Sequence, residues 1–112
     1  MPENQTLLSA IRFFNDGYYW EVHEVLEPAW SAAQGVERDW LAGLILFAGA
    51  LHQQRTRRNA DAARRLCVRG LRRWCALPDA RGGIRLRDLE RDVQRALNDP
   101  NFIPSISREP VL

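Results

Sequence analysis

The feature that most constrains the fold of this chain is a stretch of 15 uncharged residues from Trp40 to Gln54. Within it, residues 40–51 are apolar around nearly the whole circumference of a helix. A membrane-spanning helix needs about 20 apolar residues, so this stretch is too short to cross a bilayer. A helix without a polar face is normally enclosed by other elements. We therefore predict that residues 40–51 are the most buried segment, with no free side, and form the central helix of a soluble bundle.

The rest of the chain shows the same helical periodicity. Apolar residues recur three and four positions apart, whereas no alternating run is long enough to predict a strand. Asn59 is a favourable N-cap for one of the helices. The sequence thus predicts an all-α fold, a compact bundle of about five main helices around a buried central helix. The predicted helices span residues 4–15, 18–33, 37–57, 60–77 and 86–98.

With 112 residues, the chain is long enough for one domain but not for two. We predict a single helical domain over residues 1–98 and an extended tail over residues 99–112. Three prolines disfavour a helix in the tail: Pro100, Pro104 and Pro110. The first part of the tail is expected to be held against the bundle, and its last residues are expected to be loose. The apolar residues expected to hold it are Phe102, Ile103 and Ile106.

The two cysteines predict a reduced environment. If Cys67 and Cys75 lie on one helix, their spacing of eight residues corresponds to about 12 Å along its axis. A disulfide tolerates a Cα separation of about 7 Å, so these two residues cannot pair. The sequence has no C-x-x-C motif, and its first residues, MPENQTLL, do not resemble a signal peptide. We predict a cytoplasmic protein without a membrane partner.

All 16 basic residues are arginines, and they are unevenly distributed. Residues 1–54 carry seven acids and two arginines, whereas residues 55–112 carry seven acids and fourteen arginines. One face of the helix predicted over residues 60–77 is basic, and its members are Arg64, Arg65, Arg69, Arg72 and Arg73. We interpret this basic face as a solvated surface, with a phosphate-binding surface for RNA and a docking surface for an acidic protein as open alternatives. Nucleic acid is the less favoured partner, because no aromatic residues interleave with these arginines to stack on bases.

A polar cluster interrupts the apolar face of the helix predicted over residues 18–33. At 100° per residue, His23 lies within the apolar arc and Glu27 lies beside it, one turn further on. Burial of an ionised carboxylate without a partner is very costly, so Glu27 is expected to be paired, protonated or in a wet cleft. His52 lies on a side of the central helix that can approach the same site. The candidate metal ligands are therefore His23, Glu27 and His52, and the candidate lining residues are Tyr19, Trp20, Glu24 and Trp30.

Three motifs follow one another through this part of the chain. Residues 14–30 read F-x-x-G-x-Y-W-E-x-H-E-x-L-E-x-x-W, residues 35–46 read G-x-E-R-x-x-L-x-G-L-I-L, and residues 50–52 read A-L-H. Over about residues 10–77, the chain resembles the domain-of-unknown-function family numbered 309. That family is described by the motif H-x-x-x-E-x-x-(W/Y), which corresponds here to His23, Glu27 and Trp30.

The resemblance implies a compact helical bundle and a suggested metal role for the motif. It implies no particular reaction, because the biochemical function of the family is not known. Leu46 departs from the family pattern, since similar chains commonly have a glutamine at this position. The departure removes one polar neighbour from the central helix.

The polar cluster allows three interpretations. In the first, which the sequence favours, His23 and Glu27 form a buried hydrogen-bonded pair that fixes helix packing. In the second, they line a pocket for a small ligand or a divalent metal; zinc needs at least three protein ligands, and His52 or Glu24 is the candidate for the third. In the third, Glu27 is a catalytic base and His23 is the acid or a ligand, although the sequence shows no nucleophile.

These interpretations lead to one preferred function and two alternatives. The preferred function is an uncharacterised helical bundle with a candidate metal or ligand site. The first alternative is a structural or protein-interaction module in which the cluster is architectural. The second is an RNA-associated protein that uses the basic face. A homo-oligomer is compatible with each of them.

Overall fold

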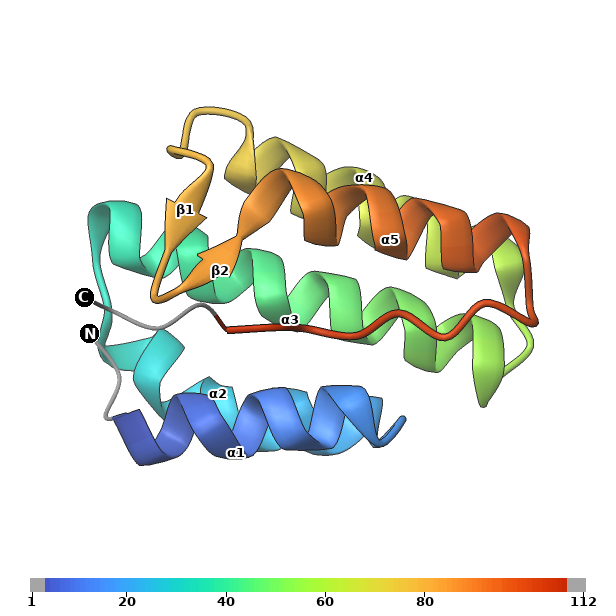
Figure 1. Cartoon of the computed structure of the whole chain (residues 1–112), viewed down its shortest axis with the longest axis horizontal. Helices are drawn as coiled ribbons and strands as arrows, with labels where there is room; N and C mark the ends of the chain where they lie inside the picture. The colour runs from blue at the N-terminus through green and yellow to red at the C-terminus, as the bar shows by residue number, and fades with distance from the viewer. Residues whose placement is uncertain (1–3, 109–112) are drawn as a thin grey trace.

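Helix α3 (Gly35–Arg55) runs through the middle of the molecule, and the other elements are arranged around it (Figure 1). The computed structural model describes residues 4–108. Around α3 lie four helices and a short hairpin: α1 (Asn4–Asn15), α2 (Tyr19–Ala32), α4 (Ala60–Trp74), β1 (Ala80–Arg81), β2 (Ile84–Arg85) and α5 (Leu86–Asn98). The predicted bundle of five main helices around a central one is confirmed for these residues.

The predicted helix ends agree closely with the observed ones. Helices α1 and α5 have the predicted bounds, whereas α2, α3 and α4 differ from theirs by one to three residues at an end. Asn59 caps α4 as predicted, because its side-chain Oδ1 accepts a hydrogen bond of 3.0 Å from the backbone N of Ala62.

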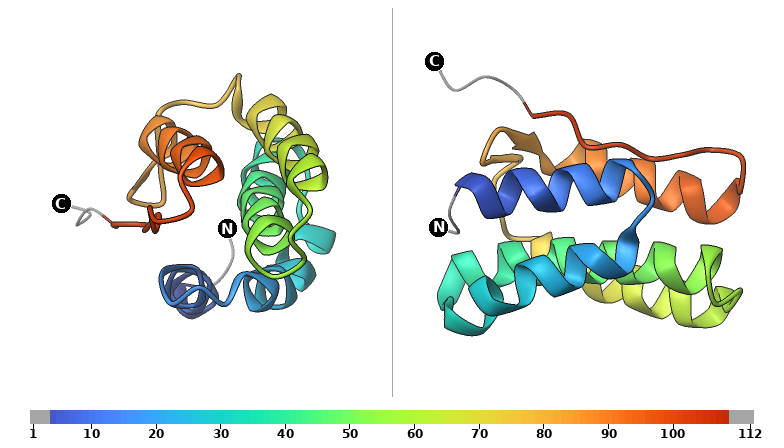
Figure 2. Two further views of the ribbon diagram at one scale, coloured as in Figure 1. Left: turned by 90° about the vertical axis from the view of Figure 1, so that its right-hand side faces the viewer. Right: turned by 90° about the horizontal axis from the view of Figure 1, so that it is seen from below.

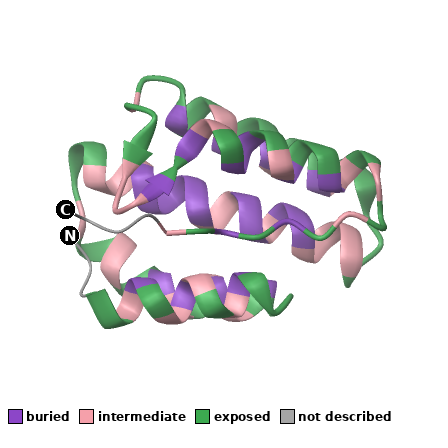
Figure 3. Ribbon diagram, in the orientation of Figure 1, coloured by how far each residue is buried: buried purple, intermediate pink, exposed green. Residues whose placement is uncertain are grey.

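Residues 40–51 are the most buried part of α3, as predicted (Figure 3). Trp40, Phe47 and Leu51 are each fully enclosed. The prediction that this segment has no free side is nevertheless wrong along one stripe, where Ile45 and Leu46 are only half-buried. The reason is geometric: α2 and α4 lie on opposite sides of α3 (Figure 2, left), and Ile45 and Leu46 line surface hollows between them.

The closest helix packing lies between α3 and α4, where two glycines make room for aromatic rings. A Cβ placed on Gly43 would lie 1.9 Å from Nε1 of Trp74, and one placed on Gly70 would lie 2.8 Å from Cε1 of Phe47. The indole Nε1 of Trp74 donates a hydrogen bond of 3.0 Å to the carbonyl oxygen of Trp40. Any larger side chain at Gly43 must therefore displace a buried indole.

The sequence did not predict the hairpin of β1 and β2. Each strand has only two residues, with Ala80 opposite Arg85 and Arg81 opposite Ile84, which is too short for an alternating pattern to be visible. The turn is formed by Gly82 and Gly83, whose φ angles of +61° and +80° favour glycine.

Residues 99–108 lie in the gap between α1 and α5 (Figure 2, left). Burial alternates along the segment: Phe102, Pro104 and Ile106 are at least half-buried, whereas Ile103 is 67% exposed. Alternate side chains of an extended segment point to opposite sides, so the expectation that Ile103 holds the tail against the bundle is wrong. The end of the predicted tail, including Pro110 and the residues expected to be loose, lies outside the described residues.

Hydrogen bonds fasten this segment along its length. The side chain of Asn15 accepts a bond of 2.6 Å from the backbone N of Ile106 and donates one of 3.0 Å to its carbonyl oxygen. Arg55 donates to the carbonyl oxygen of Phe102 at 2.8 Å, and Nε of Arg108 donates to that of Gly82 at 2.9 Å. The segment thus joins α1, α3 and the hairpin.

Both cysteines are free, with Cys67 buried and Cys75 exposed. Among residues 4–108, no helix combines the length and the apolar character that crossing a bilayer requires.

Candidate functional site

His23 and Glu27 form an ion pair or hydrogen bond along α2. Nε2 of His23 lies 3.2 Å from Oε2 of Glu27, and the two side chains are 35% and 53% exposed. The pair is therefore partly solvated, whereas the first interpretation of the sequence expected it to be buried. Solvent at the carboxylate explains how Glu27 can sit beside an apolar face without a large desolvation cost.

The pairing also determines what His23 can do chemically. An ionised carboxylate only accepts hydrogen bonds, so Nε2 of His23 carries a proton and Nδ1 is the acceptor in the neutral ring. Nδ1 is buried and has no hydrogen-bond partner among the described residues. In the neutral ring this atom is a hydrogen-bond acceptor. The catalytic roles suggested for Glu27 and His23 stay a prediction.

Trp20 lies against both histidines. Its ring centroid is 5.2 Å from that of His23 and 5.6 Å from that of His52, and its Nε1 donates a hydrogen bond of 2.6 Å to Oε1 of Glu24. His23 and His52 therefore both pack against the Trp20 indole. Within residues 4–108, no three His, Cys, Asp or Glu side chains are grouped so that they could hold a metal ion. The metal site of His23, Glu27 and His52 stays a prediction.

Two adjoining hollows lie over the uncovered stripe of α3, and His23, Ile45 and Leu46 line both of them. The first has a volume of about 170 Å³ and the second about 180 Å³. We call the two together the α2–α4 groove. The other lining residues are Tyr19, Trp20, Gly49, His52, Gln53 and Leu66 for the first hollow and Trp30, Ala42, Arg69 and Arg73 for the second.

Small and apolar residues of α3 shape the floor of the groove. Gly49 can accommodate a Cβ without displacing a neighbour, because a Cβ placed there would make an ordinary van der Waals contact of 3.4 Å with Cδ1 of Leu66. Leu46 makes the centre of the floor apolar.

Tyr19 closes one end of the first hollow. Its ring packs edge to face against Phe14, with a centroid distance of 5.5 Å. Burial raises the pKa of the Tyr19 phenol, and the positive charge of Arg55 opposes this effect only in part. The hydroxyl of Tyr19 is therefore neutral at physiological pH.

The second hollow has a different character, because cationic side chains and an indole line it. Nε1 of Trp30 is buried without a hydrogen-bond partner among the described residues, and the guanidinium of Arg38 lies 4.1 Å from the centroid of the Trp30 ring. Arg73 forms an ion pair of 2.9 Å with Asp39. Arg69 is exposed and forms no ion pair with another described residue. This end of the groove therefore offers hydrogen-bond donors and positive charge.

The basic face of α4 is exposed, but part of its charge is neutralised. All five arginines are exposed, and Arg64 forms an ion pair of 2.6 Å with Asp61. Arg69 and Arg73 lie on the edge of the face that borders the groove. The solvated surface that the sequence favoured agrees with this exposure, and binding to RNA or to an acidic protein stays a prediction.

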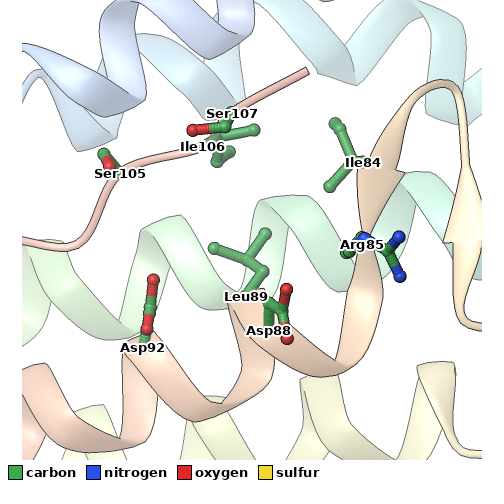
Figure 4. Close-up of a pocket in the computed structure, with 8 residues that line it drawn as sticks. All are labelled: Ile84, Arg85, Asp88, Leu89, Asp92, Ser105, Ile106 and Ser107. Atoms are coloured by element: carbon green, nitrogen blue, oxygen red, sulfur yellow. The ribbon is translucent and has the colours of Figure 1, made fainter. Parts of the chain in front are cut away.

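The largest hollow lies elsewhere, between α5, β2 and the segment 99–108 (Figure 4). Its volume is about 270 Å³, and Asp88 and Asp92 from α5 face Ser105 and Ser107 from the tail across it. Asp88 is already paired with Arg91 within α5. This hollow has neither an unpartnered buried atom nor an aromatic wall among the described residues, so the α2–α4 groove is the stronger candidate site.

Sequence reasoning found the polar residues of the groove and missed its apolar floor. Ile45, Leu46 and Gly49 were assigned to the core, because they belong to a helix that looks apolar on every side. The sequence carried no local signal for this floor, because its exposure depends on how α2 and α4 lie beside α3.

The sequence profile described as "Domain of unknown function (DUF309)" matches residues 7–66, more than half of the chain. The chain belongs to the DUF309 family. The matched segment contains α2 and α3 with the His23–Glu27–Trp30 motif, whereas Arg69 and Arg73 follow it in the sequence. The family that the three sequence motifs predicted is thereby confirmed.

A solved structure supports the same assignment. The chain is similar to the conserved hypothetical protein TTHA0068 from Thermus thermophilus, with a TM-score of 0.72 and 38% sequence identity. The match covers 82% of this chain and 95% of that protein. No curated protein matches the chain at a significant level.

Proposed function

We propose that the α2–α4 groove binds a small organic molecule, with His23 as the central polar contact. The observation that carries this proposal is the position of His23 Nδ1, a buried atom without a partner among the described residues, on a side chain that lines both hollows. A buried acceptor that finds no partner in the protein is costly to leave unpaired, and a bound ligand would supply the missing hydrogen bond.

The composition of the groove is typical of a small-molecule site. Such sites are mostly apolar, have a few placed polar groups and occupy about 300–1,000 Å³. The two hollows together reach the lower end of this range. Ile45 and Leu46 supply the apolar floor, while His23 and Trp30 supply one unpaired acceptor and one unpaired donor.

The four tryptophans allow a direct test by indole NMR signals during titration with 1-octanol, a neutral amphiphile. Trp20 and Trp30 line the groove, whereas Trp40 and Trp74 are fully buried in the core. We expect the Nε1–H signals of Trp20 and Trp30 to shift and saturate while the other two stay in place. The proposal fails if the groove signals do not move, or if all four move together.

Two variants locate the binding. Gly49→Leu fills the first hollow and is expected to weaken octanol binding about tenfold, whereas Ala32→Leu adds the same side chain at an exposed position that lines neither hollow. His23→Phe keeps a ring but removes Nδ1, and loss of one hydrogen bond predicts binding about threefold weaker. Circular dichroism shows whether each variant is folded. Equal binding by wild type and Gly49→Leu would contradict the proposal.

A divalent metal bound by His23, Glu27 and His52 is a second candidate function. It is supported by the unpartnered Nδ1 of His23 and by the contact of both histidines with Trp20. The support is weaker than for an organic ligand, because the described residues offer no group of three ligand side chains.

A further inference from the structure

The two ends of the α2–α4 groove differ in chemistry, and the difference identifies a class of ligand. The end at Gly49 and Leu66 is apolar, while the end at Trp30 is lined by Arg69 and Arg73. Resting on the proposed function, we infer that the natural ligand is a monomeric medium-chain carboxylate. Its acid group lies at Arg69, Arg73 and Trp30, and its apolar chain lies along α3 towards Gly49.

The charges at the Trp30 end support an anionic group. Arg69 has no ion pair with a described residue, while Asp39 offsets part of the charge of Arg73 at 2.9 Å. The indole Nε1–H of Trp30 is a further donor that lacks a partner among the described residues. A carboxylate can accept from several donors at once, so it matches this set better than an alcohol or an amine does.

The acidic side chains on the α2 side of the groove do not compete for these donors. Glu24 accepts the indole hydrogen bond of Trp20, and Glu27 pairs with Nε2 of His23. Neither glutamate lines either hollow. The positive charge that the ligand meets is therefore on the α4 side.

The floor of the groove sets the shape of the ligand. It extends along α3 from Ala42 to Gln53, which corresponds to about 16 Å at 1.5 Å per residue. Ile45, Leu46 and Gly49 are partly exposed and give the hollows an apolar floor along this part of α3. An extended alkyl chain fits such a floor, whereas a compact ring system would occupy only one of the two hollows.

The test compares three probes of equal chain length: octanoate, 1-octanol and octylamine, each below its aggregation concentration. The Trp20 and Trp30 indole signals report binding, and the Trp40 and Trp74 signals serve as the internal control. Because the arginines are solvent-exposed, we expect octanoate to bind about fivefold more tightly than octanol, and octylamine to bind more weakly than both.

Matched variants assign the preference to the two arginines. The double variant Arg69→Gln with Arg73→Gln is expected to reduce octanoate affinity to that of octanol and to leave octanol binding unchanged. The control is Arg64→Gln with Arg72→Gln, which removes two charges from the same helix at positions that line neither hollow. An equal loss in both double variants would overturn the inference, because it would show a general effect of net charge.

The outcomes separate this inference from the proposed function. If octanol binds and octanoate binds no more tightly, the inference fails and the proposed function stands. If no probe moves the groove signals, both fail. Two further results would overturn the inference. If dilution of the protein alone moves these signals, a second copy of the chain occupies the groove. If vesicles of anionic phospholipid move them and octanoate does not, the groove binds a membrane surface.

Discussion

The two gaps beside α3 differ in how far the chain itself covers them. Between α1 and α5, the segment 99–108 lies in the gap, buries Pro104 and Ile106, and is fastened by hydrogen bonds. Over the stripe between α2 and α4, Ile45 and Leu46 remain only half-buried, and unpaired polar atoms lie nearby. The comparison teaches that the chain covers one side of the central helix with its own tail and leaves apolar side chains partly exposed on the other.

The largest expected effect contrasts two glycines of α3. Gly43→Ala is expected to destabilise the protein by about 3 kcal/mol, because its Cβ would overlap the Trp74 indole. Gly49→Ala is expected to be neutral or to stabilise by up to about 1 kcal/mol, because the new methyl group faces the groove and alanine favours a helix. Urea denaturation measures both. Similar losses in the two variants would mean that Gly49 is packed as tightly as Gly43.

The second effect concerns the hydrogen bonds that hold residues 99–108 between α1 and α5. Asn15→Ala removes both hydrogen bonds to Ile106, and we expect a loss of about 2 kcal/mol in unfolding free energy. Amide hydrogen exchange at Ile106 should accelerate, while octanol binding in the groove should not change. Asn98→Ala is the control, since its side chain makes only an exposed bond within α5. Unchanged exchange at Ile106 would show that the Asn15 side chain does not hold this segment in place.

A third prediction concerns Glu90, a buried acidic residue of α5. Burial raises the pKa of Glu90, Arg87 lowers it and Asp79 raises it, with burial as the largest effect. A raised native pKa means that ionised Glu90 opposes folding above that pKa, and that the native state gains stability as pH falls through it. Glu90→Gln should thus be at least as stable as wild type at pH 7. On acidification, the stability of wild type should increase relative to that of the variant. Thermal melts between pH 7 and pH 4 test this prediction. It is wrong if the melting temperature of the variant rises further above that of wild type as the pH falls.

A smaller effect on stability is expected beside the stripe of α3 that lies between α2 and α4. Glu27→Ala removes the partner of His23, and because both side chains are partly exposed, we expect a loss below about 0.5 kcal/mol. Glu24→Ala, which removes the partner of Trp20, is the companion variant. If Glu27→Ala instead cost about 2 kcal/mol or more, the pair would be structural, as the first interpretation of the sequence holds.

The smallest expected effect is that of metal removal. Since no three ligand side chains are grouped among the described residues, we expect EDTA to leave the melting temperature of untagged protein unchanged. Elemental analysis of the same sample provides the second measurement. A stoichiometric metal that is lost in His23→Ala, together with a lower melting temperature after chelation, would favour the metal candidate over the organic ligand.

Most of the fold could be predicted from the sequence, because helical periodicity and one fully apolar segment determine it. Asn59, with a capping side chain, and the apolar run 40–51 carry the necessary information in local patterns. The hairpin could not be predicted, since two-residue strands have no period. Ile103 was misplaced because an extended segment alternates its side chains, and the sequence does not show which alternate set faces inwards.

The candidate site was predictable only in its polar half. His23, Glu27 and Trp30 stand out because polar side chains are unusual on an apolar helix face. The exposure of Ile45 and Leu46 depends on α2 and α4 leaving a strip of α3 uncovered, which is a property of tertiary arrangement and not of local pattern. For the same reason, the sequence did not show that the groove has an apolar and a cationic end. Gly49 and Arg69 belong to different helices, and only the tertiary arrangement places them in one groove.

The bond between Asn15 and Ile106 also bears on how the chain is made. These residues are 91 positions apart, so the contact cannot form until almost all of the described chain has left the ribosome. During synthesis, α1 to α4 can associate through contacts between neighbours in sequence, while the surface between α1 and the site of α5 stays exposed to water. The final step of folding is then a closure that joins the first helix to the last described residues, and the nascent protein is most prone to self-association just before it.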